Sequence, residues 1–177
     1  LYTRQVIDRI ADAIRSAESR HGREIFLVSD EPYRRILYDG LQYPDVFSSH
    51  QRSVVATSHS KDLGLPGERI GYVAVNPSYE GRGELVDGLV FCNRTLGFVN
   101  APALMQRLVA GLQGATVDVA AYQSKRDFMW NELTGLGYEV VKPDGAFYLF
   151  PRAPIANDVR FTDELRSHGV LVVPGRG

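Results

Sequence analysis

The sequence has little of what marks a secreted, membrane-spanning or nucleic-acid-binding protein. Its one cysteine, Cys92, excludes an intrachain disulfide framework and fits a reducing compartment; we interpret it as a small buried hydrophobe. No apolar run approaches the roughly 20 residues that span a bilayer, and no signal or transit peptide is visible. The formal net charge of −1 argues against a basic nucleic-acid-binding surface. We therefore expect a cytoplasmic protein with neither nucleic acid nor membrane as a partner.

What is present is the composition of an ordinary soluble globular protein. Of the 177 residues, 44% are apolar and 23% are charged. This length suffices for one sizeable domain, or one and a fraction. Neither an internal repeat nor a low-complexity tract interrupts the chain.

Apolar residues recur with the helical period in several segments. The first runs over residues 3–20, where Thr3 is placed as the N-cap before a stripe of isoleucine, valine and alanine. The same reasoning predicts helices over residues 79–97, 100–114, 116–136 and 161–168.

Short β-branched runs alternate with these helices. Strands are predicted over residues 24–29, 53–57 and 69–75, which together favour a mixed α/β sheet. Residues 137–141 and 146–150 flank a Pro-Asp-Gly turn and predict a hairpin, and residues 170–173 predict a further strand.

The stretch that carries chemistry surrounds Lys61. It reads Ser58-His59-Ser60-Lys61, and Arg69 follows behind a Pro-Gly turn. Lysine is the side chain that forms Schiff bases with carbonyl compounds, whereas serine hydroxyls and an arginine fork bind phosphate. An aldehyde-binding lysine beside a phosphate cradle describes a site for pyridoxal 5′-phosphate (PLP).

The longer string, Ser58-x-Ser60-Lys61 followed by Pro-Gly-x-Arg69-x-Gly-Tyr, resembles the lysine motif of the class I/II aminotransferases, which are fold-type I PLP enzymes. The resemblance implies that Lys61 carries the Schiff base with PLP. It also implies that Ser58, together with Ser60, and Arg69 hold the cofactor phosphate.

An upstream segment fits the same family. The apolar run Ile-Phe-Leu-Val-Ser ends in Asp30, and Tyr33 follows three residues later. In the family, an aspartate so placed pairs with the pyridinium nitrogen and the tyrosine reaches the phenolic oxygen of the ring. A carboxylate there keeps the nitrogen protonated, so the ring can accept electrons.

The resemblance implies an α/β fold: the later half of a PLP-binding large domain, with a mixed, mainly parallel sheet flanked by helices, and the start of an α+β small domain. Residues 1–117 would belong to the large domain and 118–177 to the small one. The implied reaction is transamination, in which Lys61 moves the proton while an amino group passes from an L-amino acid to a 2-oxo acid. A homodimer is implied and no metal is expected.

Some features of the family site are not assigned. The arginine that grips the substrate carboxylate normally lies beyond the last residue here, and Arg176 is not given that role. His59 and His168 receive none either. Since the resemblance covers only the later-middle and C-terminal parts of the family, we expect the chain to be a fragment that is inactive alone.

Two other readings stay open at this point. A related fold-type I PLP enzyme, such as a carbon–sulfur lyase or a decarboxylase-like relative, would keep the cofactor and break another bond. Alternatively, some transcription regulators carry an aminotransferase-like domain that senses PLP or an amino acid.

Overall fold

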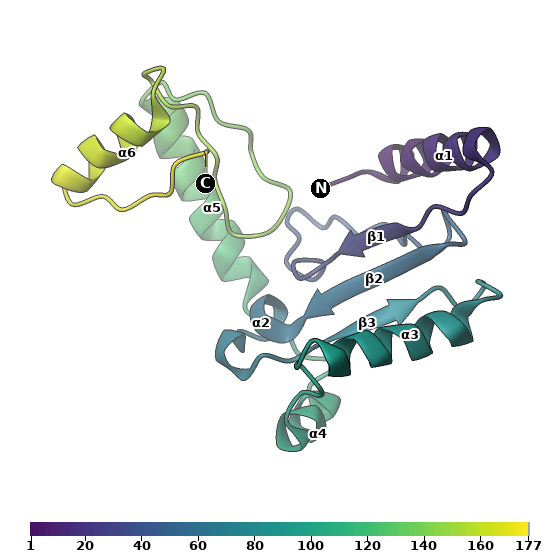
Figure 1. Cartoon of the computed structure of the whole chain (residues 1–177). Helices are drawn as coiled ribbons and strands as arrows, with labels where there is room; N and C mark the ends of the chain where they lie inside the picture. The colour runs from purple at the N-terminus through teal and green to yellow at the C-terminus, as the bar shows by residue number, and fades with distance from the viewer. Residues whose placement is uncertain (177) are drawn as a thin grey trace. The chain divides into compact units, whose positions relative to one another are not determined.

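The computed structural model describes residues 1–176, which fall into two compact units. The first unit takes in Leu1–Val119 together with Asp144–Ala146. The second takes in Ala120–Pro143 and the chain from Phe147 onward. Figure 1 shows the sheet in the first unit and most of helix α5 with α6 in the second.

A three-stranded mixed sheet organises the first unit. Its strands are β1 (Leu27–Asp30), β2 (Ser53–Ser58) and β3 (Gly71–Val75), in the spatial order β1-β2-β3. Strand β1 pairs with β2 in parallel, and β2 pairs with β3 antiparallel. The predicted α/β class with a mixed sheet is thereby confirmed.

The first helix forms where the apolar periodicity predicts it. Helix α1 spans Arg4–His21, with Thr3 at the N-cap accepting a hydrogen bond from the Val6 amide and Gly22 closing the C-terminus in the left-handed conformation. Its buried residues are Ile7 and Ala11, four positions apart and hence on one face.

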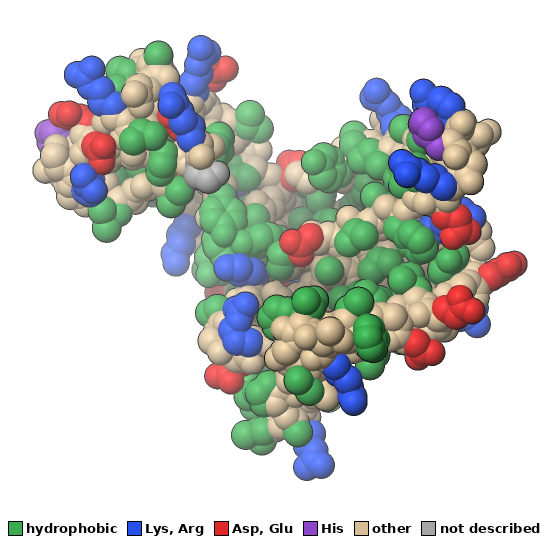
Figure 2. Space-filling model, in the orientation of Figure 1, with side chains coloured by type: hydrophobic (Ala, Val, Ile, Leu, Met, Phe, Trp, Pro, Cys, Tyr) green, Lys and Arg blue, Asp and Glu red, His purple; other side chains and the backbone are tan. Residues whose placement is uncertain are grey.

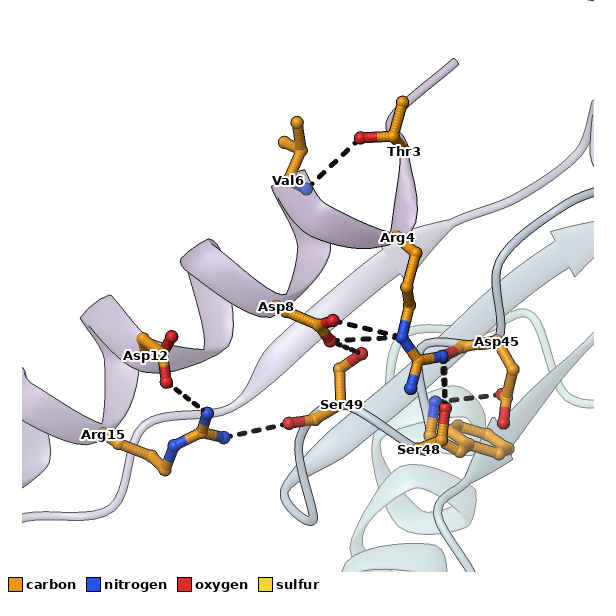
Figure 3. A network of polar contacts seen from close by, with 10 residues as sticks. Thr3, Arg4, Val6, Asp8, Asp12, Arg15, Asp45, Ser48 and Ser49 are labelled. Atoms are coloured by element: carbon orange, nitrogen blue, oxygen red, sulfur yellow. Dashed lines mark hydrogen bonds and ion pairs between the residues drawn. The ribbon is translucent and has the colours of Figure 1, made fainter.

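Polar side chains tie α1 to the segment that precedes β2 (Figure 3). Arg4 donates to the hydroxyl of Ser48 over 2.6 Å, and Arg15 donates to the carbonyl of Ser49 over 2.9 Å. The Ser49 hydroxyl in turn donates to Asp8 over 2.8 Å. The helix is therefore anchored at two of its turns along one side.

The buried apolar side chains of the described residues all belong to the first unit, and they come from α1, the 31–46 segment, β2, the residue before β3, and α4. They are Ile7, Ala11, Ile36, Tyr38, Val46, Val54, Val55, Ile70 and Val109. Asn76 is buried beside them, where its amide donates to the carbonyls of Phe47 and His50. A small core is thus closed by a satisfied polar group just after β3.

The remaining helices follow in chain order. They are the short α2 (His59–Asp62), the 3-10 turn η1 (Pro66–Glu68), α3 (Arg82–Thr95), α4 (Ala103–Gly111), α5 (Val119–Gly135) and α6 (Asp158–Ser167). The helices predicted over residues 79–97, 100–114 and 116–136 are present but shorter at both ends, whereas α6 begins three residues before the predicted position 161. None of the described helices is long and apolar enough to cross a membrane.

Helix α3 runs alongside β3 but buries none of its described residues (Figure 1). Phe91 is 69% exposed, and on β3 Val73 is 52% exposed. Figure 2 shows apolar side chains gathered over the sheet on the face drawn. Cys92 also lies on α3 and is exposed, so its interpretation as a buried residue is wrong.

The hairpin predicted over residues 137–150 is wrong. The described residues there form no strand, and Gly145 instead makes an isolated antiparallel bridge with Leu37. Ala146 follows with a φ of 60°, which interrupts an extended strand. The turn residues thus pair with Leu37 in the first unit, and residues 137–141 and 146–150 do not pair with each other as strands.

The strand predicted over residues 170–173 is also wrong, because the described chain is irregular there. A strand forms only where its backbone groups find a neighbouring strand, and no described strand runs beside this segment. The Val170 amide instead donates to the Leu165 carbonyl, as a continuation of the end of α6.

Candidate active site

Two predicted site residues close the two parallel strands. Asp30 is the last residue of β1 and Ser58 the last of β2, and the register places Asp30 beside Ala56. Parallel strands end at the same edge of a sheet, which is where open α/β sheets place their ligands. Asp30 is exposed, and its carboxylate makes no hydrogen bond or ion pair with any described residue.

Lys61 lies on α2, which follows β2 directly. Ser58 precedes this helix in an extended conformation, with φ −142° and ψ 156°, and turns the chain from strand to helix. The Lys61 side chain reaches over Tyr33, with Nζ 5.9 Å from the centroid of the ring. The structure thus brings together the lysine and the tyrosine that the sequence analysis assigns to one site.

The predicted phosphate-binding groups are placed less uniformly. Ser58 and Ser60 are half-buried, and neither hydroxyl makes a hydrogen bond to a described residue. Arg69 is exposed in the left-handed conformation, with φ 49°, and its Nη1 donates to the Pro66 carbonyl over 3.0 Å. The guanidinium is therefore turned onto its own loop, whereas the two hydroxyls are available to a ligand.

Gly71 explains how the Arg69 loop comes close to Ser58. Strand β3 pairs Gly71 with Ser58, and a Cβ atom at Gly71 would lie 2.3 Å from the Thr57 carbonyl oxygen and 2.9 Å from the Ser58 Cα. A residue with a side chain does not fit at this approach. The backbone at the start of β3 is therefore pressed against the end of β2.

Glu31, beside Asp30, is a buried acid that the sequence analysis did not single out. Its side chain is 3% exposed and lies 3.5 Å from the guanidinium of Arg34. Burial raises the pKa of Glu31, while the Ser29 hydroxyl and the Arg34 charge act in the opposite direction. In the sequence, the two adjacent acids Asp30 and Glu31 at the end of the apolar run indicate an acidic site, but they do not show which of the two is buried.

A second buried acid, Asp62, also went unpredicted. Its Oδ2 lies 3.3 Å from Nδ1 of His59, and both side chains are 8% exposed. The signal in the sequence is the spacing of a histidine and an aspartate three residues apart, one on each side of Lys61, which places them on one side of a helical turn.

A cavity of about 260 Å³ lies on the first unit next to this pair, and Lys61 is not among its lining residues. It is lined by Arg34, Arg35, Thr57, His59, Asp62, Tyr72 and Gln113. A larger cavity of about 740 Å³ belongs to the second unit and contains none of the predicted site residues. No group of histidine, cysteine or acidic side chains in the described part of the chain has the arrangement of a metal site.

The edge of the sheet therefore combines four chemical functions. An amine lies over a phenol ring, and a carboxylate with no hydrogen-bonding or ionic partner among the described residues ends the neighbouring strand. Two serine hydroxyls that make no hydrogen bond to those residues shortly precede the lysine in the chain. These groups fit a ligand that has an aldehyde, an aromatic ring and a phosphate. The fit is supported by the lysine–tyrosine contact and by the unused hydroxyls.

Comparisons with known proteins point in one direction. The family described as aminotransferase class I and II matches residues 12–177. A probable aspartate aminotransferase of Methanocaldococcus jannaschii is 32% identical over 169 residues, covering 90% of this chain and 43% of the relative. The aspartate/prephenate aminotransferase of Thermus thermophilus is 32% identical over 161 residues, covering 86% of this chain and 40% of the relative.

A solved structure gives the same result for the fold. The crystal structure of an aminotransferase from Eubacterium rectale superposes with a TM-score of 0.93 at 40% identity, over 98% of this chain and 44% of that one. The chain thus spans less than half the length of the relatives it matches.

Proposed function

The chain belongs to the class I and II aminotransferases, and from this membership we propose that it serves the transfer of an amino group from an L-amino acid to a 2-oxo acid, with PLP held at Lys61. The observation that carries the proposal is the position of Lys61 Nζ over Tyr33, beside the edge where Asp30 and Ser58 end their strands. Since the chain spans 43% of its Methanocaldococcus relative, the transfer is proposed for the protein to which these residues belong.

The roles of the residues follow from their chemistry. PLP, when bound, supplies an electron sink for the carbanion left by loss of a substrate proton. Lys61 would hold the cofactor at its aldehyde carbon and, when displaced by the amino group of the substrate, would accept the α-proton of the substrate and return it. Asp30 would keep the ring nitrogen protonated, because a carboxylate stabilises an adjacent cation. Tyr33 would donate a hydrogen bond from its hydroxyl to the phenolic oxygen of the ring.

The phosphate is assigned to the remaining three residues. Ser58 and Ser60 donate from hydroxyls that make no hydrogen bond to a described residue. Arg69 binds as a fork when its guanidinium leaves the Pro66 carbonyl, an exposed contact that is easily exchanged for a charged partner.

The arrangement of the whole protein is proposed on the same basis. We assign residues 1–117 to a PLP-binding large domain and 118–177 to a small domain; the two compact units support this division. A homodimer in the cytoplasm, acting on free amino acids and 2-oxo acids, is the form we propose. The exposed apolar side chains of α3 are compatible with further packing, and the single cysteine fits a reducing compartment.

The test of the lysine assignment is direct, because the sequence holds only three lysines, Lys61, Lys125 and Lys142. The chain is incubated with PLP, reduced with borohydride and mapped by peptide mass spectrometry. The adduct is expected on Lys61, is lost in Lys61→Ala and persists in the matched control Lys125→Ala. An adduct that survives Lys61→Ala on another lysine contradicts the assignment.

The reaction itself is tested with amino acid donors and 2-oxoglutarate. Amino transfer produces glutamate, whereas a lyase produces an oxo acid without glutamate. If the whole protein forms glutamate and its Lys61→Ala variant does not, the lysine that carries the adduct is also the one that the reaction requires.

A further inference from the structure

A buried histidine–aspartate pair encloses the turn that carries Lys61. His59 and Asp62 are the first and last residues of α2, and their side chains meet with Nδ1 and Oδ2 3.3 Å apart. The His59 ring also lies 5.9 Å from the ring of Tyr72, centroid to centroid. Both ends of the turn are therefore fixed inside the protein, while the lysine between them is half-buried.

The backbone of the same two residues is tied to distant parts of the first unit. The His59 amide donates to the Ile70 carbonyl over 3.0 Å, which joins α2 to the start of β3. The Asp62 carbonyl accepts from the Val117 amide over 2.8 Å and from the Thr116 hydroxyl over 3.0 Å. The two residues that form the side-chain pair are thus also the two that anchor the turn.

A helix of four residues is not stable by itself, because nucleation fixes several residues for a single hydrogen bond. The direction in which Lys61 leaves α2 therefore depends on its anchors. A free lysine side chain samples many rotamers, and holding reactive groups in the productive geometry supplies much of the rate of a reaction between them.

The pair is a poor device for stability alone. Oδ1 of Asp62 is buried and makes no hydrogen bond within the described residues. A buried oxygen without a donor is unfavourable, and buried charged pairs can often be replaced by apolar side chains at no loss of stability. A buried polar atom left unsatisfied in a native structure calls for an explanation, and a role in function is one of them.

We propose that His59 and Asp62 form a positioning pair, which fixes the α2 turn so that Lys61 Nζ is presented to the aldehyde of the cofactor. This inference rests on the proposed function. The pair acts through the turn and does not touch the reacting atoms. Nδ1 of His59 contacts Asp62, and both side chains line the 260 Å³ cavity, of which Lys61 is not a lining residue.

The experiment compares one apolar replacement with one conservative one. The double variant His59→Phe, Asp62→Leu removes the polar contact and keeps similar volume and the ring contact to Tyr72. The single variant His59→Asn keeps a side-chain N–H that can donate to Asp62. The matched control is His50→Phe, since His50 is also a buried histidine of the first unit but bonds to the carbonyl of Ile25.

Three quantities are measured on the whole protein with each substitution: the rate at which PLP forms the borohydride-trappable imine with Lys61, the affinity for pyridoxine 5′-phosphate, and the midpoint of unfolding in urea. Pyridoxine 5′-phosphate has the ring and the phosphate but lacks the aldehyde, so its affinity does not depend on where the amine points.

For the double variant, we expect imine formation at least about tenfold slower, as follows from losing one contact that orients the amine. The affinity for pyridoxine 5′-phosphate and the unfolding midpoint stay the same or rise. His59→Asn recovers most of the rate, and the control His50→Phe leaves the rate unchanged.

Two results overturn the proposal. An unchanged rate in the double variant shows that the pair does not orient Lys61. A parallel fall of the rate, the affinity and the unfolding midpoint shows that the His59–Asp62 pair has only a structural role. If the double variant does not fold, the single variant Asp62→Asn replaces it and is judged by the same three measurements. Failure of the unsubstituted whole protein, of which this chain is a part, to form the imine at Lys61 refutes the proposed function itself, and this inference with it.

Discussion

Replacing Gly71 with alanine adds one methyl group at the closest approach of two strands in the site. The new Cβ would lie 2.3 Å from the Thr57 carbonyl oxygen and 2.9 Å from the Ser58 Cα. The first distance is roughly 1 Å shorter than ordinary van der Waals contact. Both neighbours are backbone atoms, so no change of rotamer relieves the clash, and β3 has to move away from β2 at the pair of Gly71 with Ser58.

Overpacking of this kind costs about 1–3 kcal/mol of unfolding free energy. For a chain of this size each kcal/mol lowers the thermal midpoint by roughly 2–4 °C. The measurement is urea unfolding followed by circular dichroism, with thermal unfolding as a second reading. Displacement of Ser58 is expected to weaken the binding of pyridoxine 5′-phosphate as well, because this serine is a proposed phosphate ligand.

The matched control is Gly88→Ala in the interior of α3, where nothing lies within 4 Å of the added Cβ. Alanine there removes only the entropic penalty of glycine in a helix and is expected to stabilise the chain by about 0.5–1 kcal/mol. The two substitutions make the same chemical change, but the expected changes in unfolding free energy have opposite signs. If Gly71→Ala were as stable as the unsubstituted chain, the close approach of the strands would be refuted.

Two further predictions concern a proposed ligand and a buried acid. Arg69→Lys keeps the charge but loses the fork, so PLP affinity on titration should fall roughly ten- to a hundredfold; an unchanged affinity would count against Arg69 as a phosphate ligand. Burial raises the pKa of Glu31 above its ordinary 4.5, so the protonated acid is the form favoured by folding. The stabilising contribution of Glu31 is then fully present below pH 4.5 and is lost as the pH rises through the raised pKa. The Glu31→Gln variant is expected to show no such loss. If the unfolding free energies of the unsubstituted chain and of this variant ran parallel with pH, the prediction would be contradicted.

The parts of the fold that depend on local pattern could be predicted from the sequence. Thr3, the apolar stripe of α1 and Gly22 are start, face and stop signals within one segment, and the helix forms between them. The three strands of the sheet were predicted too, because each is a short apolar or β-branched run bounded by turn residues.

The errors arise where a segment's partner lies far away in the chain. Residues 137–150 have the alternation of a hairpin, but Gly145 pairs with Leu37, and Ala146 adopts a left-handed conformation that its side chain does not signal. The strand expected at residues 170–173 fails for the same reason, since the local sequence does not say whether a neighbouring strand exists.

The candidate site divides in the same way. The motif around Lys61 was visible because the family resemblance carries its spacing. The structure adds what spacing alone could not show: that Tyr33 lies beneath the lysine, that Glu31 is the buried acid next to Asp30, and that the residues flanking Lys61 meet inside the protein.

The backbone hydrogen bonds that anchor the Lys61 turn have a consequence for local unfolding. The Val117 amide donates to the Asp62 carbonyl, and the His59 amide donates to the Ile70 carbonyl. An amide so bonded exchanges its hydrogen with solvent only when its acceptor moves away. Val117, just before α5, should therefore exchange at the rate at which the Lys61 turn opens, so that two segments far apart in the chain form one cooperative unit of local unfolding.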